Sequence, residues 1–514
     1  MIGGGINGAA VARDAALRGL RVALIDRGDF AGQTSSRSTK LIHGGLRYLP
    51  QGQLRLVYDA LRERERLTRL TAPHLVRPIP FVFPVYAGRT VSRTALRAGL
   101  FLYDLLARTP PEQRHQTLSA DTIAEMEPQL ARSGLRGGAL YYDGHADDSR
   151  LTLENALDAM LHGAAAANYV ALTGLDREGG KIRAAQVREA FSGDEFAIRA
   201  RSYVNAAGPW LDAVRRMDDP GAAAAVRLTK GVHLMLKPER VPVRNSLVLS
   251  DGAGRIVFVI RQRGSLLLGT TDTDYSGEPD QVRAERADVD YLLDVLAQAI
   301  PDAALSAQDV TTTFAGLRSL VAGRSFRAPS RLPREELIVR SRSGMLSIAG
   351  GKLTTHRRIA QRVVDLVCRE LGKKAGRSPT LTTPLPGARS ASHRLVQAGS
   401  ITPSARAELA ARYGFRTGLL DRLIELNPAL AQPLAPHCPV LAAEAVHAAK
   451  FEMALTLEDF LLRRTALALR DPAQAEAVAA RAACLMGSEL GWSAERKASE
   501  SARFCAALKA RREF

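Results

Sequence analysis

The chain has 514 residues and a formal net charge of +18, with 46% hydrophobic and 24% charged residues. This length and composition predict two or three folded domains and exclude a disordered chain. The excess of Lys and Arg favours anionic partners, but without a run of basic residues and with 5% aromatics a nucleic-acid partner is not expected.

A glycine-rich turn opens the chain and precedes a predicted helix at residues 9–18. Gly3 permits a tight turn, Gly5 lets a pyrophosphate approach the backbone, and Gly8 lets the helix pack closely on a strand. The amides at the start of this helix would face the phosphates. The turn therefore predicts a dinucleotide site formed by Gly3, Gly5, Ile6, Asn7 and Gly8.

A predicted strand at residues 21–25 carries Asp26 at its carboxyl end. An acid at this distance accepts hydrogen bonds from the adenosine ribose and repels a 2′-phosphate, so NADP is disfavoured. The strand that normally precedes the turn is nearly absent, since only Met1 and Ile2 come before it. Whether the start lies upstream or this strand is shortened stays open, and a flavin-free relic is one interpretation of it.

Residues 34–49 read TSSRSTKLIHGGLRYL. With this string the sequence closely resembles the FAD-dependent glycerol-3-phosphate dehydrogenases, which are amino-acid-oxidase-like flavoproteins. The hydroxyls suit pyrophosphate oxygens and the paired glycines would let the chain pass close to the flavin ring; a hydroxyl-rich loop with a glycine turn is the alternative. The resemblance implies FAD contacts from Thr34, Ser35, Ser36, Lys40, His43, Gly44, Gly45 and Leu46.

Further matches run along nearly the whole chain. Residues 204–210 resemble the family's second cofactor-contacting strand and turn, and residues 350–355 follow a predicted strand, 346–349, as in its last flavin-binding turn. A helix N-terminus together with Lys352 would stabilise negative charge on reduced flavin. These motifs add Ala207, Gly208, Trp210, Gly351, Lys352, Leu353 and Thr354 to the expected FAD contacts.

The resemblance implies oxidation of glycerol 3-phosphate to dihydroxyacetone phosphate by hydride transfer from C2 to FAD. The phosphate needs cations and the C2 hydroxyl needs a proton acceptor. His233 is the expected base, because the pKa of histidine lies near working pH, with a structural histidine as the alternative. The expected catalytic residues are His233, Arg318 and Lys352. The expected substrate contacts are Arg47, Tyr48, Thr270, Arg318, Arg334 and Lys352, and the local match is loosest at Arg334.

The resemblance predicts an α/β fold whose Rossmann-like FAD domain is discontinuous, at residues 1–50, 145–215 and 310–372. A mixed-sheet substrate domain is expected at residues 51–144 and 216–309, and a helical C-terminal domain at 389–514. From the residue pattern we expect a crossover helix at 151–167, a hairpin at Gly179-Gly180 and strands at 246–249, 256–260 and 265–268.

The family's partners are a membrane quinone and an anionic membrane surface, with the protein peripheral on the cytoplasmic face of the inner membrane; a homodimer is also considered. No apolar run reaches the roughly 20 residues that cross a bilayer. Residues 89–108 form a predicted basic amphipathic helix, which either lies in the membrane interface or packs on the core. Its apolar positions are Leu96, Leu100, Tyr103 and Leu106.

Four cysteines without a CxxC pair argue against a disulfide framework, an iron–sulfur cluster or a structural zinc site, so no metal is expected. Two enzymatic alternatives stay open. The first is a glycerol-3-phosphate oxidase that uses oxygen, and the second is a related FAD oxidoreductase of amino or hydroxy acids.

Overall fold

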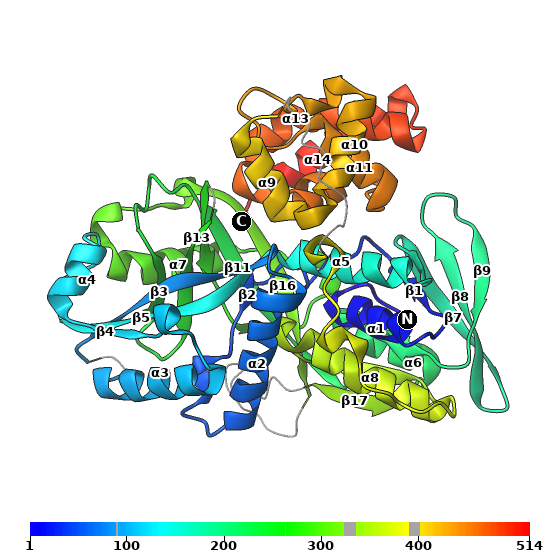
Figure 1. Cartoon of the computed structure of the whole chain (residues 1–514), viewed down its shortest axis with the longest axis horizontal. Coiled ribbons are helices and arrows are strands. Elements are labelled where there is room, and N and C mark those ends of the chain that lie inside the picture. Colours follow the sequence, from blue (N-terminus) through cyan, green and yellow to red (C-terminus); the bar gives the residue numbers. More distant parts are fainter. Residues whose placement is uncertain (89–90, 263, 323–335, 390–400) are drawn as a thin grey trace.

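The computed structural model describes residues 1–88, 91–262, 264–322, 336–389 and 401–514 (Figure 1). Its elements confirm the α/β class. The helices are α1 Ile6–Leu17, α2 Leu54–Arg66, α3 Arg93–Ala107, α4 Ala120–Met126, α5 Asp148–Leu161, α6 Leu211–Asp218, α7 Arg286–Ala299, α8 His356–Glu370, α9 Pro403–Tyr413, α10 Thr417–Leu426, α11 Ala442–Phe451, α12 Leu467–Arg470, α13 Pro472–Leu490 and α14 Ala494–Ala510. The strands are β1 Ala23–Ile25, β2 Leu41–Ile42, β3 Val76–Tyr86, β4 Gln116–Leu118, β5 Leu135–Ala146, β6 Ala165–Ala167, β7 Val170–Glu178, β8 Lys181–Glu189, β9 Glu195–Arg199, β10 Val204–Asn205, β11 Val226–Leu236, β12 Ser246–Ser250, β13 Ile256–Gln262, β14 Ser265–Gly269, β15 Thr273–Asp274, β16 Val310–Val321, β17 Leu337–Arg340 and β18 Leu346–Ala349.

The nucleotide-binding region is a sheet built from segments far apart in the sequence. β1 pairs in parallel with β6, and β10 pairs in parallel with β18. Ile2 joins the two pairs, because it bridges Ile25 on one side and Asn205 on the other. A single residue thus stands where the first strand was expected. Helix α1 packs against both α5 and α8, giving the Rossmann-like arrangement.

The predicted crossover helix at 151–167 is too long at its carboxyl end. Helix α5 begins after Asp147, whose side chain caps the amide of Arg150, and it ends at Leu161. Gly163 then adopts a positive φ of 86°, which breaks the helix. The alanines that follow form β6 instead, because pairing with β1 overrides their helix propensity.

A large mixed sheet forms the second region, in the order β15-β11-β14-β13-β12-β3-β5-β2, with β16 paired to β11 and β4 to β5. The structure confirms the strands expected at 246–249, 256–260 and 265–268 as β12, β13 and β14, and the hairpin as β7–β8. β16 pairs with β11 along nearly its whole length, although its sequence lies in the third predicted segment of the FAD domain. This pairing joins the large sheet to the nucleotide-binding region.

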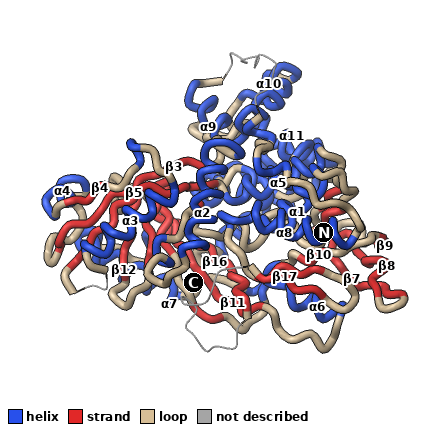
Figure 2. Tube along the Cα trace, turned by 60° about the horizontal axis from the view of Figure 1, so that its bottom comes forward, coloured by secondary structure: helices blue, strands red, loops and turns tan. Residues whose placement is uncertain are grey.

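Helices α9–α14 form a separate layer at one end of the molecule (Figures 1 and 2). Helix α3 packs on the face of the large sheet that carries Phe81 and Tyr141, and α7 packs on the other face. A continuous apolar core links the C-terminal helices to the large sheet, including Phe314 of β16 and Tyr413 of α9. The chain returns to the sheet at its carboxyl end, where the amide of Thr313 donates to the carbonyl of Arg511 (3.0 Å). The C-terminal helices therefore pack on the region that carries the site.

Candidate active site

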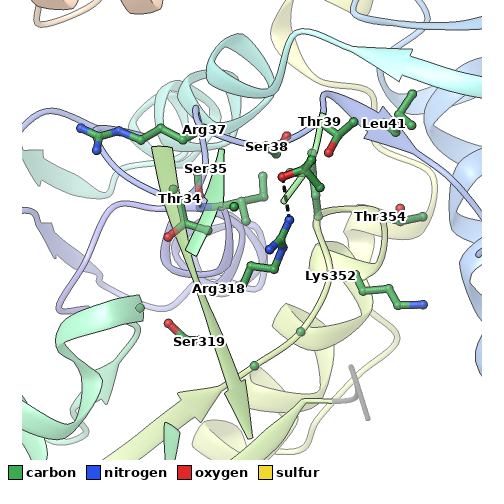
Figure 3. Close-up of a pocket in the computed structure, with 18 of the residues that line it drawn as sticks. Thr34, Ser35, Arg37, Ser38, Thr39, Leu41, Arg318, Ser319, Lys352 and Thr354 are labelled. Carbon is green, nitrogen blue, oxygen red and sulfur yellow. Dashed lines mark hydrogen bonds between the residues drawn. The ribbon is translucent and has the colours of Figure 1, made fainter. Parts of the chain in front are cut away.

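A cavity of about 2200 Å³ runs between the nucleotide-binding region and the large sheet. Most single-ligand pockets measure roughly 300–1,000 Å³, so this one has room for a dinucleotide and a small substrate together. Its wall includes the glycine turn, the 34–49 segment, β11, β16 and the turn after β18. Figure 3 shows part of this wall, with Arg318 near the centre and the side chains of Arg37 and Lys352 pointing outward on opposite sides of it.

The dinucleotide end of the cavity is formed by the start of α1. Gly3 has a φ of 101°, which favours glycine, and a Cβ on Gly8 would lie 1.8 Å from the carbonyl oxygen of Gly3. The backbone amide of Ile6 donates to Ser35 Oγ (2.9 Å), so the predicted phosphate-binding hydroxyl already lies at the helix N-terminus. Amides and a hydroxyl at this point fit a pyrophosphate.

Asp26 lines the cavity at the carboxyl end of β1. Its carboxylate accepts the backbone amides of Gly4 (2.6 Å) and Gly28 (2.9 Å). Burial nevertheless raises the pKa of Asp26 to about 6, since these amides only partly offset the loss of hydration. A ribose that donates hydroxyl hydrogen bonds here would stabilise the ionised carboxylate.

The part of the cavity expected to hold the flavin lies between the His43–Leu46 segment and the turn after β18. Gly350 and Gly351 both have positive φ, and this lets the chain turn sharply before α8. Thr354 ties the two segments together, because its Oγ1 accepts the amide of His43 (3.2 Å). Lys352 Nζ lies 4.0 Å from the centroid of the Tyr48 ring. The backbone and Lys352 thus fit a flavin that gains negative charge on reduction.

Most of the predicted site residues line this one cavity. They are Gly3, Gly5, Ile6, Asn7, Asp26, Thr34, Ser35, His43, Gly45, Leu46, Arg47, Tyr48, Ala207, Gly208, Trp210, His233, Thr270, Arg318, Gly351, Lys352, Leu353 and Thr354. Four predicted cofactor contacts, Gly8, Ser36, Lys40 and Gly44, do not line it. Arg334 lies outside the described residues.

The four exceptions have other contacts. Lys40 adopts a φ of 58° and pairs with Asp148 at the start of α5, so its ammonium group is buried away from the cavity. Ser36 Oγ donates to the carbonyl of Gln33 (3.1 Å), and the amide of Gly44 donates to Tyr103 Oη (2.7 Å). Gly8 lets the start of α1 pack closely on the glycine turn, because a Cβ there would collide with the carbonyl oxygen of Gly3.

Arg318 provides the best-defined cationic group of the site. Its guanidinium donates to Thr270 Oγ1 (3.0 Å), the carbonyl of Thr271 (3.2 Å) and Asp272 (3.1 Å). A Cβ on Gly231 would lie 2.5 Å from it, so β11 passes directly beneath. Burial lowers the pKa of Arg318 and nearby Arg47 lowers it further, although Asp272 opposes both. An incoming dianion would relieve this repulsion.

His233 lies on β11, opposite Gly269 and Phe314 on the neighbouring strands. Burial lowers its pKa well below the usual value near 6.5, and the positive charges of Arg318 and Lys40 act in the same direction. The imidazole is therefore neutral at physiological pH, and the expectation that its pKa lies near working pH is wrong, because burial disfavours the charged ring.

The sequence interpretation did not single out several residues of the wall, among them Arg37, Thr39, Asp272, Glu458 and Arg463. Thr39 lies inside the matched string at residues 34–49, so its polar side chain was a usable signal. Glu458 and Arg463 come from the C-terminal domain, more than 400 residues after the glycine turn, and local sequence carries no sign of that contact.

The C-terminal domain supports the cofactor end of the cavity through a π-helical segment, Asp459–Arg464. Arg463 and Arg464 both donate to Asp29, which follows the ribose-side Asp26 in the same loop. Burial alone would raise the pKa of Asp29, but the two guanidinium groups outweigh it and lower that pKa. The loop is therefore fixed by buried ion pairs.

Comparison with known sequences gives two matches that together span most of the chain. The family described as FAD dependent oxidoreductase matches residues 1–357, and the C-terminal domain of alpha-glycerophosphate oxidase matches residues 378–497. The first match covers more than half of the chain and includes the glycine turn, β11 and Arg318. The FAD cofactor expected from the sequence is thereby confirmed.

Individual relatives agree with this assignment. A glycerol-3-phosphate dehydrogenase of Synechocystis sp. is 38% identical over 489 residues, which cover 91% of this chain and 88% of the relative. The aerobic glycerol-3-phosphate dehydrogenase of Bacillus subtilis is 35% identical over 90% of this chain and 86% of its own. The solved structure of the Bacillus halodurans glycerol-3-phosphate dehydrogenase complexed with FAD aligns with a TM-score of 0.79, at 29% identity, over 100% of this chain and 93% of that one. The chain therefore belongs to the FAD-dependent glycerol-3-phosphate dehydrogenase family.

Proposed function

We propose that this chain oxidises sn-glycerol 3-phosphate to dihydroxyacetone phosphate and passes the electrons to a membrane quinone. One observation carries the substrate assignment. Arg47, Arg318 and Lys352 line the same cavity as a neutral His233, so cations for a phosphate and an acceptor for a hydroxyl proton are present together. Two relatives that are 38% and 35% identical are both named as glycerol-3-phosphate dehydrogenases.

The residues divide the work of the reaction. Bound FAD supplies the acceptor for the hydride from C2. Arg318 and Arg47 hold the phosphate and fix the distance of C2 from the flavin end, while His233 takes the hydroxyl proton. Lys352 stabilises negative charge near the turn after β18. These roles are those of the expected site residues, and Arg334 keeps its predicted role in phosphate binding.

The test is an anaerobic titration of the purified holoenzyme. Glycerol 3-phosphate should bleach the oxidised flavin band, whereas alanine and lactate should leave it unchanged. Bleaching by an amino or hydroxy acid and not by glycerol 3-phosphate would contradict the substrate assignment and favour the alternative oxidoreductase class.

The quinone proposal is supported by an apolar part of the cavity wall next to α3. This part comprises Phe81, Phe83, Val91, Ala95, Leu96, Gly99, Leu102, Tyr141, Val248 and Phe258. Such a wall suits a quinone ring and its hydrocarbon tail and offers nothing to a phosphate. Gly99→Leu should fill the cavity beside this apolar wall and lower turnover with a short-chain quinone at least about tenfold. Anaerobic bleaching and turnover with ferricyanide should stay unchanged; rapid turnover with oxygen alone would instead identify an oxidase.

Membrane contact is supported by the outer faces of α2 and α3. The apolar stripe predicted on α3 faces inward, since Leu96, Leu100 and Tyr103 are buried in the core. The outward stripe of α3 nevertheless carries Phe101 and Leu105, each 64% exposed. The exposed Arg93 and Arg97 continue this stripe toward the N-terminus of α3 at intervals of four residues. Leu54 and Tyr58 of α2, which contacts α3, are exposed as well. No described helix is long and apolar enough to span a bilayer, so this face would bind peripherally.

Vesicle flotation tests this surface. Phe101→Ser/Leu105→Ser should weaken binding to vesicles containing anionic lipid by about tenfold or more, since two large apolar side chains leave the interface. Phe196→Ser/Leu161→Ser is the matched control, because those side chains are 47% and 67% exposed elsewhere. Equal losses from both pairs would contradict the proposal. The cytoplasmic face of the inner membrane and a homodimer stay predictions.

A further inference from the structure

The imidazole of His233 is enclosed by the sheet. One face stacks on Phe314, with ring centroids 4.8 Å apart and planes at 15°. A Cβ on Gly269 would lie 2.3 Å from Cδ2, so that edge of the ring occupies the space a larger residue would need. Only 1% of His233 is exposed. A substrate hydroxyl therefore has little direct access to this ring.

The polar contact of the ring is with Thr39. Nε2 of His233 lies 2.9 Å from Thr39 Oγ1. Nδ1 is buried and has no hydrogen-bond partner within the described part of the chain. Thr39 itself is half-buried and lines the cavity, where Figure 3 shows it with Arg318 and Lys352. The hydroxyl of Thr39 thus contacts Nε2 of His233 and also lines the cavity, which the mostly buried ring touches as well.

The position of Thr39 is fixed by both neighbours. Ser38 Oγ donates to Asp148 (2.7 Å), and Lys40 Nζ forms a buried ion pair with the same carboxylate. The amide of Lys40 also donates to Ser38 Oγ (2.9 Å). Because the residues on either side are tied to the start of α5, the Thr39 hydroxyl has little freedom to leave His233.

We propose that Thr39 relays the C2 hydroxyl proton of the substrate to His233. This inference rests on the proposed function. The O–H bond at C2 breaks and its proton passes to Thr39 Oγ1, while Thr39 gives its own proton to Nε2 of His233. The C2–H bond breaks as well, its electron pair leaves as hydride to FAD, and the C2 carbonyl forms. His233 gains one positive charge, and Thr39 ends unchanged.

The surroundings of His233 suit this relay. Arg318 and Lys40 are the charged groups that act on it, and both oppose its protonation in the resting state. The ring is therefore neutral at rest, and an imidazolium formed in the reaction readily loses its proton again by the same hydroxyl. The relay thus predicts that catalysis needs the hydroxyl of Thr39 as well as the ring.

The test compares Thr39→Val, which removes the hydroxyl at nearly constant volume, with Thr39→Ser, which keeps it. The rate of anaerobic flavin bleaching by glycerol 3-phosphate should fall about 100-fold or more in Thr39→Val and by less than about threefold in Thr39→Ser. The pH dependence of kcat/KM that His233 causes should disappear in Thr39→Val and persist in Thr39→Ser. Thr311→Val, which makes the same substitution on β16 outside the cavity, should have little effect.

A double-mutant cycle separates a relay from a structural role. His233→Asn alone should lower the bleaching rate about as far as Thr39→Val, and the combined variant should be no slower than His233→Asn by more than about threefold. Tm and FAD content of each variant show whether it is folded and loaded. A Thr39→Val enzyme with the rate and pH profile of the wild type would overturn the relay, as would additive losses in the cycle. A wild-type enzyme that glycerol 3-phosphate fails to bleach would instead contradict the proposed function.

Discussion

Buried arginines at the C-terminal interface differ from those in the cavity in how their charge is balanced. At the interface, Arg150 donates to both carboxylate oxygens of Glu452 (2.7 and 2.9 Å), and neither side chain is exposed. In the cavity, Arg318 contacts Asp272 at 3.1 Å and lies near the like charge of Arg47. At the interface, acids of the chain itself neutralise the arginines. In the cavity, an added anion would neutralise positive charge that the chain leaves uncompensated. Balance by the chain's own acids thus separates the structural arginines from Arg318, which we propose to bind the substrate.

Two aspartates in one loop show the same difference. Asp29 accepts hydrogen bonds from Arg463 and Arg464, which lower its pKa against the effect of burial. Asp26 lies three residues earlier and accepts backbone amides, and burial raises its pKa to about 6. Asp29 is therefore held by two arginines of the chain, whereas Asp26 can still accept hydrogen bonds from a ligand.

The largest expected effect is on stability at the interface. Arg150→Met leaves the Glu452 carboxylate buried without its bidentate partner, and we expect it to lower the free energy of unfolding by about 3–5 kcal/mol. Urea denaturation of the holoenzyme measures this. Protein that stays folded should keep the kcat of the wild type; a loss of kcat at unchanged stability would contradict the comparison.

Arg318→Met should have the opposite pattern. It removes charge-assisted hydrogen bonds to the substrate phosphate, so kcat/KM should fall about 100- to 1,000-fold, or roughly 3–4 kcal/mol. The free energy of unfolding should change by less than about 1 kcal/mol, since the repulsion from Arg47 is also removed. Steady-state kinetics and urea denaturation of one preparation measure both. A variant destabilised as strongly as Arg150→Met would place Arg318 among the structural arginines.

The FAD affinity of the apoprotein should depend on Asp26. Because its pKa is raised to about 6 and ribose hydroxyls favour the ionised carboxylate, affinity should be constant well above pH 6. As pH falls through 6 the carboxylate protonates, and affinity should drop by up to about tenfold per pH unit. Fluorescence titrations at pH 8, 6 and 5 test this. Asp26→Asn should bind more weakly at pH 8 and lose the dependence; an unchanged dependence would assign it to another group.

The smallest effect is expected at the surface. Arg286 and Asp290 form an exposed pair one turn apart on α7, with side chains 65% and 48% exposed. Arg286→Met should change the free energy of unfolding by no more than about 0.5 kcal/mol, because water and salt screen the pair. The same denaturation experiment makes it the matched control for Arg150→Met. A comparable loss in both variants would mean that burial does not set the cost.

Sequence motifs were enough to identify the family, the class of the fold and a set of site residues most of which line one cavity. The helix at the glycine turn and the strands β12, β13, β14 and β18 follow from patterns a few residues long, because capping, glycine conformation and side-chain alternation act locally. The hydroxyl and glycine motifs are equally local, and so Ser35, His43 and Lys352 could be identified as parts of one site.

Only the tertiary structure decided which side chains face the cavity. Lys40 forms its ion pair with Asp148, which lies 108 residues later in the chain. The alanines at 165–167 pair with β1 as strand β6, although their sequence predicted a continued helix. Thr39 meets His233 across 194 residues, and Arg464 reaches Asp29 across 435. Such contacts depend on segments that folding brings together, and a side chain's direction is set by its partner across the fold. No pattern within a few residues of either group contains that information.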